Sequence, residues 1–343
     1  MITSAPIPSW SSILLAYFNE LSDDFLASPW QIQKNATWFS KSAHALATLI
    51  APGDYLWLPE YFCNQSTIPA RNKMVNIIFY PVKDNFTPDW EKCDLLYKPG
   101  NNKFILVHYF GIENDIYGAL NFCSSKNISL IEDAAHVLLP SGNIGKFSDY
   151  TFYSPHKLLG IADGSILVSN HNTDIKTNYS LDTPWNWLIK RIIQKITPLW
   201  LWHHLKPMPP ADFFLDSEGG LSISPNMLKF SRKMLATYLP NLDQEAAIRR
   251  DREKEWEGKL KSWPGIIPIN GAIIPYRAVF RCDSETIACC YFNRLRELQI
   301  PVESWPDLPP EVKATPNSLA ITLRKTLLFL PITAKIPAIP VLP

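Results

Sequence analysis

Residues 128–168 read ISLIEDAAHVLLPSGNIGKFSDYTFYSPHKLLGIADGSILV, and this stretch decides the fold. The apolar run Ile128–Ile131 is followed by Asp133, and a second run, Tyr150–Tyr153, is followed closely by Lys157. Short, near-continuous apolar runs of this kind are typical of parallel strands that are buried on both faces of a sheet. Open parallel sheets bind ligands beyond the carboxyl ends of their strands. We therefore expect the carboxylate and the amine to meet in one crevice.

The same alternation of apolar runs and helical patterns extends through the first half of the chain. Strand-like runs occupy 55–58, 75–80 and 103–108, and helical patterns occupy 43–50, 64–71 and 116–125. This alternation predicts an α/β fold with a mostly parallel central sheet flanked by helices. Ahead of it, the first forty residues are interpreted as a leading segment with one short helix at 10–21.

The second half of the chain predicts a smaller unit that is joined to the first by a helix. Between about 171 and 221 the pattern loosens, and we interpret this part as an irregular helical excursion rather than a membrane-surface patch. Asn241 is placed to cap a charged helix that runs to Trp263. The patterns that follow are a strand at 273–281, a helix at 284–298, a strand at 300–305 and an apolar run at 326–331. We therefore expect a large domain at 1–240, and a bridging helix with a small α+β C-terminal domain at 241–343.

The composition argues against several classes of protein. The 343 residues include 33 Lys+Arg and 32 Asp+Glu, so the net charge of +1 attracts neither nucleic acid nor an anionic surface. Neither G-x-G-x-x-G nor G-x-x-x-x-G-K-[ST] occurs, which removes the main support for a dinucleotide or P-loop site. The six cysteines form no C-x-x-C pair, so we expect reduced thiols and no metal site. Because no signal-peptide pattern opens the chain, we expect a cytoplasmic protein without nucleic-acid or membrane partners.

An acid and an amine at one sheet edge suit the cofactor pyridoxal phosphate (PLP). In such enzymes a lysine forms a Schiff base with the cofactor, and a carboxylate keeps the ring nitrogen protonated so that the ring accepts electrons. Lys157 and Asp133 are the candidates for these two roles. Each also has a plainer interpretation, because an aspartate after a strand commonly caps a helix and a single lysine is commonly a solvated surface charge.

The motifs around these residues resemble those of a known family. EDAAH at 132–136 matches the pattern E-D-x-A-[QH], and FYSPHKLLG at 152–160 with DGSILV at 163–168 matches the family's lysine motif. Further matches are SKSA at 40–43, PGD at 52–54, PEYFC at 59–63 and VHYFG at 107–111. The chain thus resembles the DegT/StrS-type PLP-dependent sugar aminotransferases, which belong to the aspartate aminotransferase superfamily of fold type I. The resemblance implies the PLP-dependent transferase fold.

The resemblance also implies roles for the residues of the two central motifs. Lys157 would bind the cofactor covalently and move the proton between substrate and cofactor, and Asp133 would pair with the ring nitrogen. His136 would contact the cofactor near its phenolic oxygen, although a purely structural histidine is an equal alternative. Ser154, three residues before the lysine, would bind the phosphate.

Two upstream segments are implied to complete the cofactor site. Ser42 and the N–H groups beside it would bind the phosphate, unless Ser42 serves only as a helix cap. Lys41 stands where the family has glycine, and its side chain is itself a candidate phosphate ligand. The ring-stacking residue is either Phe62, the better π-face, or Cys63, which the alignment favours, and both stay open.

The sequence also departs from the family pattern. The usual double glycine after the lysine is Gly164-Ser165, and the segment G-Y-N-x-R-M, which lends an asparagine to the partner subunit's phosphate, has only a poor counterpart at 222–227. The chain ends at Pro343, where relatives continue into a final helix, so we expect a truncated small domain.

The resemblance implies an aminotransferase that moves an amino group from glutamate to a nucleotide-linked keto sugar, for surface polysaccharide or amino-sugar biosynthesis. The expected assembly is a homodimer. One alternative is a PLP-dependent sugar dehydratase, which carries histidine in place of the lysine, and here His156 lies next to Lys157. The other alternative is a non-catalytic family member that acts as a binding or regulatory protein.

Overall fold

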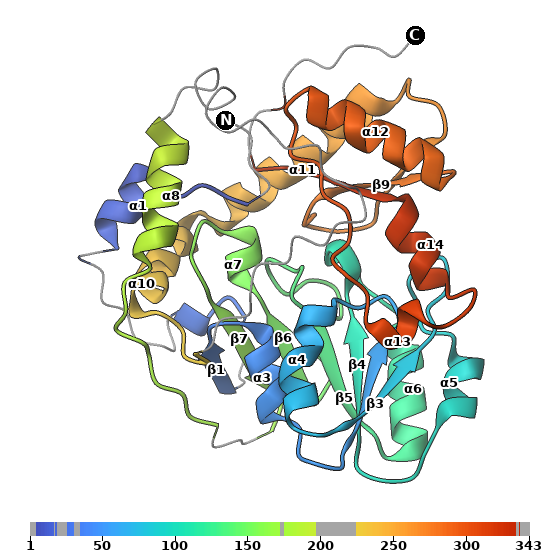
Figure 1. The fold of residues 1–343 in the computed structure, drawn as a ribbon. Helices are drawn as coiled ribbons and strands as arrows, with labels where there is room; N and C mark the ends of the chain where they lie inside the picture. The colour runs from blue at the N-terminus through green and yellow to red at the C-terminus, as the bar shows by residue number, and fades with distance from the viewer. Residues whose placement is uncertain are drawn as a thin grey trace.

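The computed structural model describes residues 5–16, 18, 26–30, 35–171, 175–196, 224–333 and 336 of the chain. Within these residues the elements form a large sheet, a smaller sheet and the helices around them (Figure 1). Among the described residues, no helix is both long enough and apolar enough to cross a membrane.

Seven strands form the large sheet within the described residues, in the order β1-β7-β6-β5-β4-β2-β3. The strands from β3 to β6 run parallel to one another, whereas β7 is antiparallel to β6 and β1 is antiparallel to β7. Their bounds are β1 Asn35–Phe39, β2 Tyr55–Pro59, β3 Asn76–Tyr80, β4 Asn102–Val107, β5 Ser129–Ala134, β6 Tyr150–Tyr153 and β7 Ser165–Ser169. The predicted mostly parallel α/β sheet is confirmed.

Helices connect the parallel strands in the way that parallel pairing requires. The connecting helices are α4 (Asn64–Asn72), α5 (Trp90–Leu96) and α6 (Ile116–Lys126), and α3 (Ser42–Thr48) follows β1. Helix α6 shows why the chain turns where it does. Asp115 Oδ1 accepts a hydrogen bond from the Gly118 N–H at 2.9 Å, and Asn127 ends the helix in the left-handed conformation.

The smaller sheet differs from its prediction in two places. Within the described residues it holds β8 (Ile266–Ile269), β9 (Ala278–Cys282) and β10 (Leu327–Leu330), all antiparallel in the order β10-β9-β8. Strand β8 was not predicted, because its residues alternate poorly between buried and exposed positions. The predicted strand at 300–305 is wrong: only Glu303 forms a bridge, with Phe329.

Long helices cover the smaller sheet. They are α11 (Leu242–Leu260) and α12 (Glu285–Glu297), with the shorter α14 (Leu319–Thr326), whereas α13 (Pro310–Lys313) lies against the large sheet's side of the molecule. A helix is therefore present where the bridging helix was predicted, although it ends at Leu260 rather than at Trp263, and its bridging role stays a prediction. Asn241 does occupy its N-cap position, but its side chain makes no capping hydrogen bond, so the expected cap is wrong in its chemistry.

An aromatic cluster joins the two sheets. Trp305 stacks on Tyr61 with the ring centroids 4.4 Å apart, and it also contacts the Tyr109 and Phe110 rings. Phe329 of β10 packs against Phe110 at 5.3 Å. Residues on both sides of the predicted boundary at 240 therefore share one core, and the boundary itself stays a prediction.

A third group of helices lies at one edge of the molecule, where α1 (Trp10–Leu15), α8 (Trp185–Ile196) and α10 (Lys229–Tyr238) are neighbours (Figure 1). Helix α1 starts where predicted and ends at Leu15, while 17 and 19–21 lie outside the described residues. Helix α8 belongs to the predicted excursion, of which 172–174 and 197–221 also lie outside. The expected truncation concerns the end of the chain, where 337–343 lie outside the described residues too.

Candidate active site

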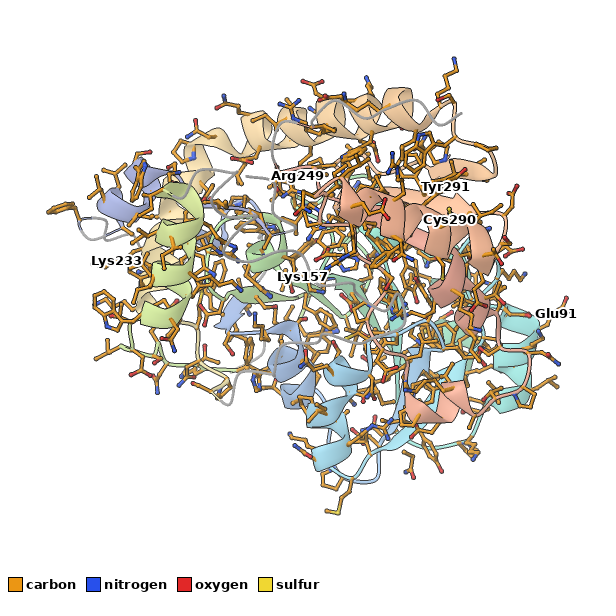
Figure 2. The ribbon with its side chains drawn as sticks, turned by 45° about the horizontal axis from the view of Figure 1, so that its top comes forward. Glu91, Lys157, Lys233, Arg249, Cys290 and Tyr291 are labelled. Carbon is orange, nitrogen blue, oxygen red and sulfur yellow. The ribbon has the colours of Figure 1, made fainter. Side chains whose placement is uncertain are left out.

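The carboxyl ends of β5 and β6 bring the predicted acid and amine together. Asp133 of β5 pairs in register with Phe152 of β6, and α7 (Pro155–Leu158), which carries Lys157, begins just beyond β6. Figure 2 shows Lys157 near the centre of the molecule. Burial raises the pKa of Asp133, and the nearby charge of Lys157 partly opposes this rise. The charges of the two groups therefore interact at one edge of the sheet.

His136 lies next to the lysine amine. Its Nε2 is 3.5 Å from Lys157 Nζ, at the long limit of a hydrogen bond, and its Nδ1 accepts from the Phe110 N–H at 3.3 Å. Burial, and then the charges of Lys157 and Arg277, hold the pKa of His136 well below its usual value. The imidazole is therefore neutral near pH 7, and its Nε2 lies beside the lysine amine.

A stack of side chains covers one face of the His136 ring. The Tyr276 ring lies parallel to the imidazole with the centroids 4.1 Å apart and the planes at 4°. The Arg277 guanidinium lies over the Tyr276 ring at 4.3 Å and donates from Nε to Glu303 at 3.3 Å. Gly111 allows this approach: its φ is +92°, and a Cβ there would come within 2.8 Å of the Ile274 carbonyl oxygen.

Ser154 presents a buried hydroxyl with an unused hydrogen-bonding capacity. The residue is fully buried at the start of α7, and among the described residues its Oγ has no hydrogen-bond partner. Buried hydroxyls in folded proteins nearly always have a partner, so an orphaned one calls for a ligand or another explanation. Its position three residues before Lys157 makes a phosphate oxygen a suitable partner.

Lys41 and Ser42 lie at the start of α3. Burial lowers the pKa of Lys41 to about 8, although the carboxylate of Asp163 opposes this and the charge of Lys157 adds to it. These electrostatic neighbours place the Lys41 amine close to the Lys157 region. Ser42, half-buried, is the first helical residue, and the turn before it is fixed by the Gly164 N–H, which donates to the Ser40 carbonyl at 2.9 Å.

The two candidates for the ring-stacking role lie at the start of α4. Phe62 is buried within the main core, and Cys63 is half-buried in the N-cap position. The choice between them stays a prediction.

The profile described as the DegT/DnrJ/EryC1/StrS aminotransferase family matches residues 70–272, which is more than half of the chain. The chain belongs to this family. The matched range contains Asp133, His136 and Lys157, and it confirms the resemblance that the motifs indicated. No curated protein matches the sequence.

Solved structures of two aminotransferases and a dehydratase have the same fold. The PLP form of the putative sugar aminotransferase Spr1654 from Streptococcus pneumoniae is 14% identical, with a TM-score of 0.72 over 98% of this chain and 94% of that chain. PseC of Helicobacter pylori, an aminotransferase involved in the biosynthesis of pseudoaminic acid, is 13% identical, with a TM-score of 0.69 over 96% and 93%. GDP-4-keto-6-deoxy-D-mannose-3-dehydratase of E. coli, solved with bound hydrated PLP, is 15% identical, with a TM-score of 0.68 over 96% and 95%. These likenesses confirm the predicted PLP-dependent transferase fold.

Glu132, the glutamate of the family's E-D-x-A-[QH] motif, precedes Asp133 in β5 and holds neighbouring segments together by hydrogen bonds. Glu132 is fully buried and accepts from His108 Nε2 at 2.8 Å and from the Gly145 N–H at 2.9 Å. Although burial opposes ionisation, the hydrogen bond and charge of His108 keep the pKa of Glu132 below its usual value. His108 is oriented in turn by the Asn114 N–H, which donates to its Nδ1 at 3.1 Å. This buried pair fixes the ends of β4 and β5.

Arg249 is a site residue of this family member that the sequence interpretation missed. The side chain is buried, and it reaches from α11 to the carbonyls of Leu158, Pro275 and Tyr276. Burial lowers the pKa of Arg249 to about 10, and the charge of Arg277 adds to the effect. A signal was present: Arg249 falls on the same helical stripe as the buried residues Leu242, Ala246, Trp256 and Leu260.

Tyr276 and Arg277 were also missed as site residues. Both lie inside the predicted strand at 273–281, but β9 begins only at Ala278, so these two residues belong to the segment that crosses His136. The pattern around them reads as an ordinary apolar strand, and their approach to His136 depends on tertiary packing more than 130 residues away in sequence. No local signal in the sequence marks them.

Proposed function

We propose that this family member transfers an amino group from glutamate to a nucleotide-linked keto sugar, with PLP as its cofactor. The carrying observation is the pairing of Lys157 Nζ with His136 Nε2 at 3.5 Å, at the sheet edge where Asp133 ends β5. Membership of an aminotransferase family supports the reaction class. The similarity to Spr1654, a putative sugar aminotransferase, and to PseC, an aminotransferase of pseudoaminic acid biosynthesis, supports a sugar acceptor. We infer that the product serves surface polysaccharide or amino-sugar biosynthesis.

The residues present fit this cofactor. The Ser154 hydroxyl, which has no partner among the described residues, would donate a hydrogen bond to a phosphate oxygen. The amine of Lys41, with Ser42 and the first N–H groups of α3, would complete the anion site. A bound phosphate dianion would also raise the pKa of Lys41, which burial has lowered to about 8, and so keep its amine fully charged.

Bound PLP supplies a ring that accepts electrons while the amino group is exchanged. Burial raises the pKa of Asp133, so its ionised carboxylate needs a positively charged partner. It would face the ring nitrogen and keep that nitrogen protonated. Lys157 Nζ would hold the cofactor and carry the proton that leaves the substrate carbon. The neutral His136 places its Nε2 beside that amine and adds no competing charge. Two half-reactions at one site predict ping-pong kinetics.

The amino donor needs a group that binds its carboxylates. Arg277 is buried, and although burial opposes it, the neighbouring Tyr276 and Glu303 raise its pKa, so the guanidinium stays charged. It lies in the same stack as His136, and a guanidinium matches a carboxylate with two parallel hydrogen bonds. We infer that Arg277 binds the dicarboxylate donor after exchanging its contact with Glu303.

The dehydratase alternative depends on His156 rather than Lys157 serving as the reactive residue. His156 Nδ1 donates to the Gly164 carbonyl at 2.8 Å, and burial holds its pKa well below the usual value. This contact occupies the imidazole with the backbone, whereas the lysine amine is directed at His136. The geometry therefore supports the lysine, and with it transamination.

The test compares Lys157→Ala with Lys146→Ala, a control at an exposed lysine that follows β5. Purified wild-type protein and Lys146→Ala should be yellow with PLP, and borohydride should bleach them and leave the cofactor covalently attached. Lys157→Ala should bind PLP without a covalent bond and should lose transfer activity at least about a thousandfold, because the proton carrier is gone. Mass spectrometry of the reduced protein locates the modified residue.

Two outcomes would contradict the proposal. Retention of the covalent bond in Lys157→Ala would mean that another residue carries the cofactor. Colourless wild-type protein that fails to transfer the amino group of glutamate to any of a panel of nucleotide keto sugars would favour the non-catalytic alternative. Dehydration of the sugar without amino transfer would favour the dehydratase.

A further inference from the structure

One side of helix α8 exposes a row of large apolar side chains. Trp185, Ile189, Ile193 and Ile196 follow one another at spacings of four, four and three residues, so they share one side of the helix, and they are between 43% and 61% exposed. Leu188 and Gln194 of the same helix are buried. Within the part of the chain that the structure describes, α8 therefore packs by one side and leaves this apolar row exposed.

Helix α1 extends this surface. Trp10, Leu14 and Leu15 are each at least 45% exposed. Lys195 Nζ donates to the Pro8 carbonyl at 2.9 Å and lies 5.4 Å from the centre of the Trp10 ring, so the two helices are adjacent, as Figures 1 and 2 both show. We call the exposed residues of α1 and α8 the α8 face. Apolar patches of this kind mark interaction surfaces.

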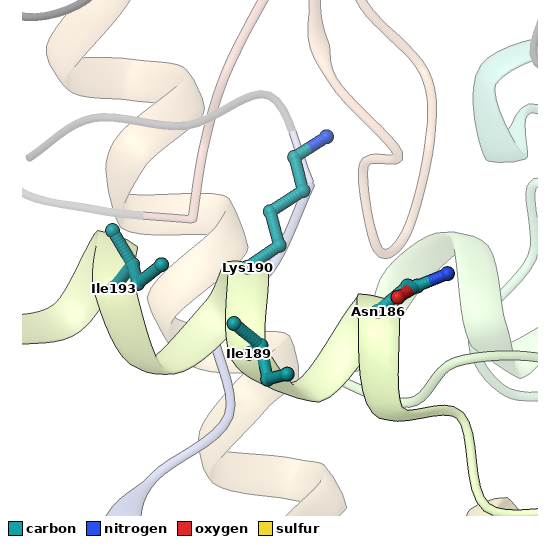
Figure 3. A pocket seen from close by; sticks show the side chains of 4 residues that line it. All are labelled: Asn186, Ile189, Lys190 and Ile193. Atoms are coloured by element: carbon teal, nitrogen blue, oxygen red, sulfur yellow. The ribbon is translucent and has the colours of Figure 1, made fainter.

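The helices around the α8 face carry only basic charges, although the exposed Asp182 lies three residues before α8. The described helices α1, α8 and α10 contain no Asp or Glu, and they carry six basic residues: Lys190, Arg191, Lys195, Lys229, Arg232 and Lys233. Since the whole chain has a net charge of only +1, the remainder of the chain is net negative. Figure 3 shows Lys190 extending from α8 beside Ile189 and Ile193, where these residues and Asn186 line an open hollow. Basic side chains therefore accompany the apolar row on the same helix and on the neighbouring α10.

We propose that the α8 face binds the surface of a membrane that contains anionic phospholipid, with α8 lying in the plane of the headgroups. A helix with an apolar row that includes Trp and Ile, and with lysines beside it, binds in this way. The apolar side chains enter the boundary between headgroups and acyl chains, and the lysines contact the phosphates. Surface binding also agrees with the lengths of the helices, since no described helix is long and apolar enough to cross a membrane.

A second copy of the chain is a poorer occupant of the α8 face. In a twofold dimer the same surface meets itself, so the basic residues of both copies would approach one another without an acid from α1, α8 or α10 between them. The sequence interpretation of 171–221 placed a membrane patch second because periodicity alone does not tell which side of a helix the protein covers. The structure supplies that information for α8.

The experiment is sedimentation of the full-length holoenzyme with vesicles. Vesicles of phosphatidylcholine with 30% phosphatidylglycerol should bind the protein, and vesicles of phosphatidylcholine alone should bind it at least about tenfold more weakly. Ile189→Asp/Ile193→Asp should reduce binding at least about tenfold, and Lys190→Gln about fivefold. The matched control is Ile68→Asp, which changes a similarly exposed isoleucine on the distant helix α4. It should bind as the wild type does.

Each result decides the matter. Loss of binding at 0.5 M NaCl would support the proposal, because salt screens the contact with the phosphates. Equal reductions in Ile68→Asp and in the α8 variants, or no binding to either vesicle, would overturn it. If the vesicles bind nothing and Ile189→Asp/Ile193→Asp lowers the sedimenting mass, the α8 face is instead an interface between copies. PLP absorbance and melting temperature should be unchanged in all variants, which shows that they are folded.

Discussion

The hydroxyl of Ser154 is buried without a described partner, and this has opposite consequences in the two states of the protein. Without cofactor, an unsatisfied buried hydroxyl costs about 1–3 kcal/mol. We therefore expect Ser154→Ala to raise the free energy of unfolding of the cofactor-free protein by about 1 kcal/mol. If Ser154 binds the phosphate, the same change should weaken PLP binding about tenfold. Urea unfolding and a cofactor titration measure the two effects.

Ser165→Ala is the control for this prediction. Ser165 is equally buried on β7, but its hydroxyl already donates to the Tyr153 carbonyl at 2.8 Å. Its loss should destabilise the protein by about 1 kcal/mol with or without PLP. Destabilisation of the cofactor-free protein by Ser154→Ala as well would show that its hydroxyl has a partner inside the fold.

The sequence predicted some site residues for a physical reason that does not extend to the others. Asp133 and Lys157 each follow the end of an apolar run, and neighbouring parallel strands necessarily end at one edge. Arg249 and Tyr276 reach the site from separate elements far along the chain. Their contacts depend on how α11 and the β9 approach pack, which no local pattern records.

Helix α11 is tied to the catalytic turn by one side chain. Arg249 donates to the carbonyl of Leu158 on α7 and to those of Pro275 and Tyr276. Arg249→Met keeps most of the volume but removes the donors, and three buried or partly buried carbonyls lose a partner. We expect the free energy of unfolding to fall by about 2–4 kcal/mol, measured by urea denaturation.

Arg250→Met is the matched change one position along α11. Arg250 is exposed, and its guanidinium makes one long hydrogen bond of 3.5 Å to the Ile273 carbonyl. The expected loss is under about 0.5 kcal/mol. Similar losses for both variants would mean that the buried contacts of Arg249 add little to stability.

Elements were predicted well where burial on both faces gave a continuous apolar run, and poorly at sheet edges. The strand at 150–153 has the predicted bounds. β1, which we interpreted as part of a leading segment, instead pairs antiparallel with β7 at the sheet edge. Its sequence, NATWF, is too short and mixed to stand out, because an edge strand has fewer buried positions. The strand predicted at 300–305 reduces to one bridge for the opposite reason: its apolar residues fill the core without pairing.

The whole molecule should lose stability as the pH falls below 6.5. Burial, and then nearby lysine charges, hold the pKa values of His136 and His156 well below 6.5. In the unfolded chain both imidazoles bind protons near pH 6.5. The unfolded state therefore binds more protons below that pH, so the free energy of unfolding decreases there by up to about 1.4 kcal/mol per pH unit for each histidine. The two histidines together contribute a loss of about 2–3 kcal/mol between pH 7.5 and 5.5 in the cofactor-free protein, and Glu253, whose pKa burial raises to about 7, partly offsets it.

His156→Gln isolates this effect. Burial raises the pKa values of Asp133 and Asp163, so these carboxyls act in the opposite direction over the range between 3.8 and their folded values. Their contribution is common to the wild type and the variant, so the difference between the two belongs to the histidine. In urea titrations the variant should lose about 1.4 kcal/mol less than the wild type between pH 7.5 and 5.5. An equal loss would mean that His156 takes up its proton inside the folded protein at an ordinary pH.

The stacking of Trp305 on Tyr61 has a consequence for how the chain can be divided. The indole seals the same aromatic cluster that contains Tyr109 and Phe110, although it comes from the last fifth of the sequence. During synthesis on the ribosome, the apolar cluster above the first sheet therefore stays open until the final forty or so residues emerge. Fragments that stop short of Trp305 would inherit that unsealed cluster, whatever the completeness of the strands beneath it.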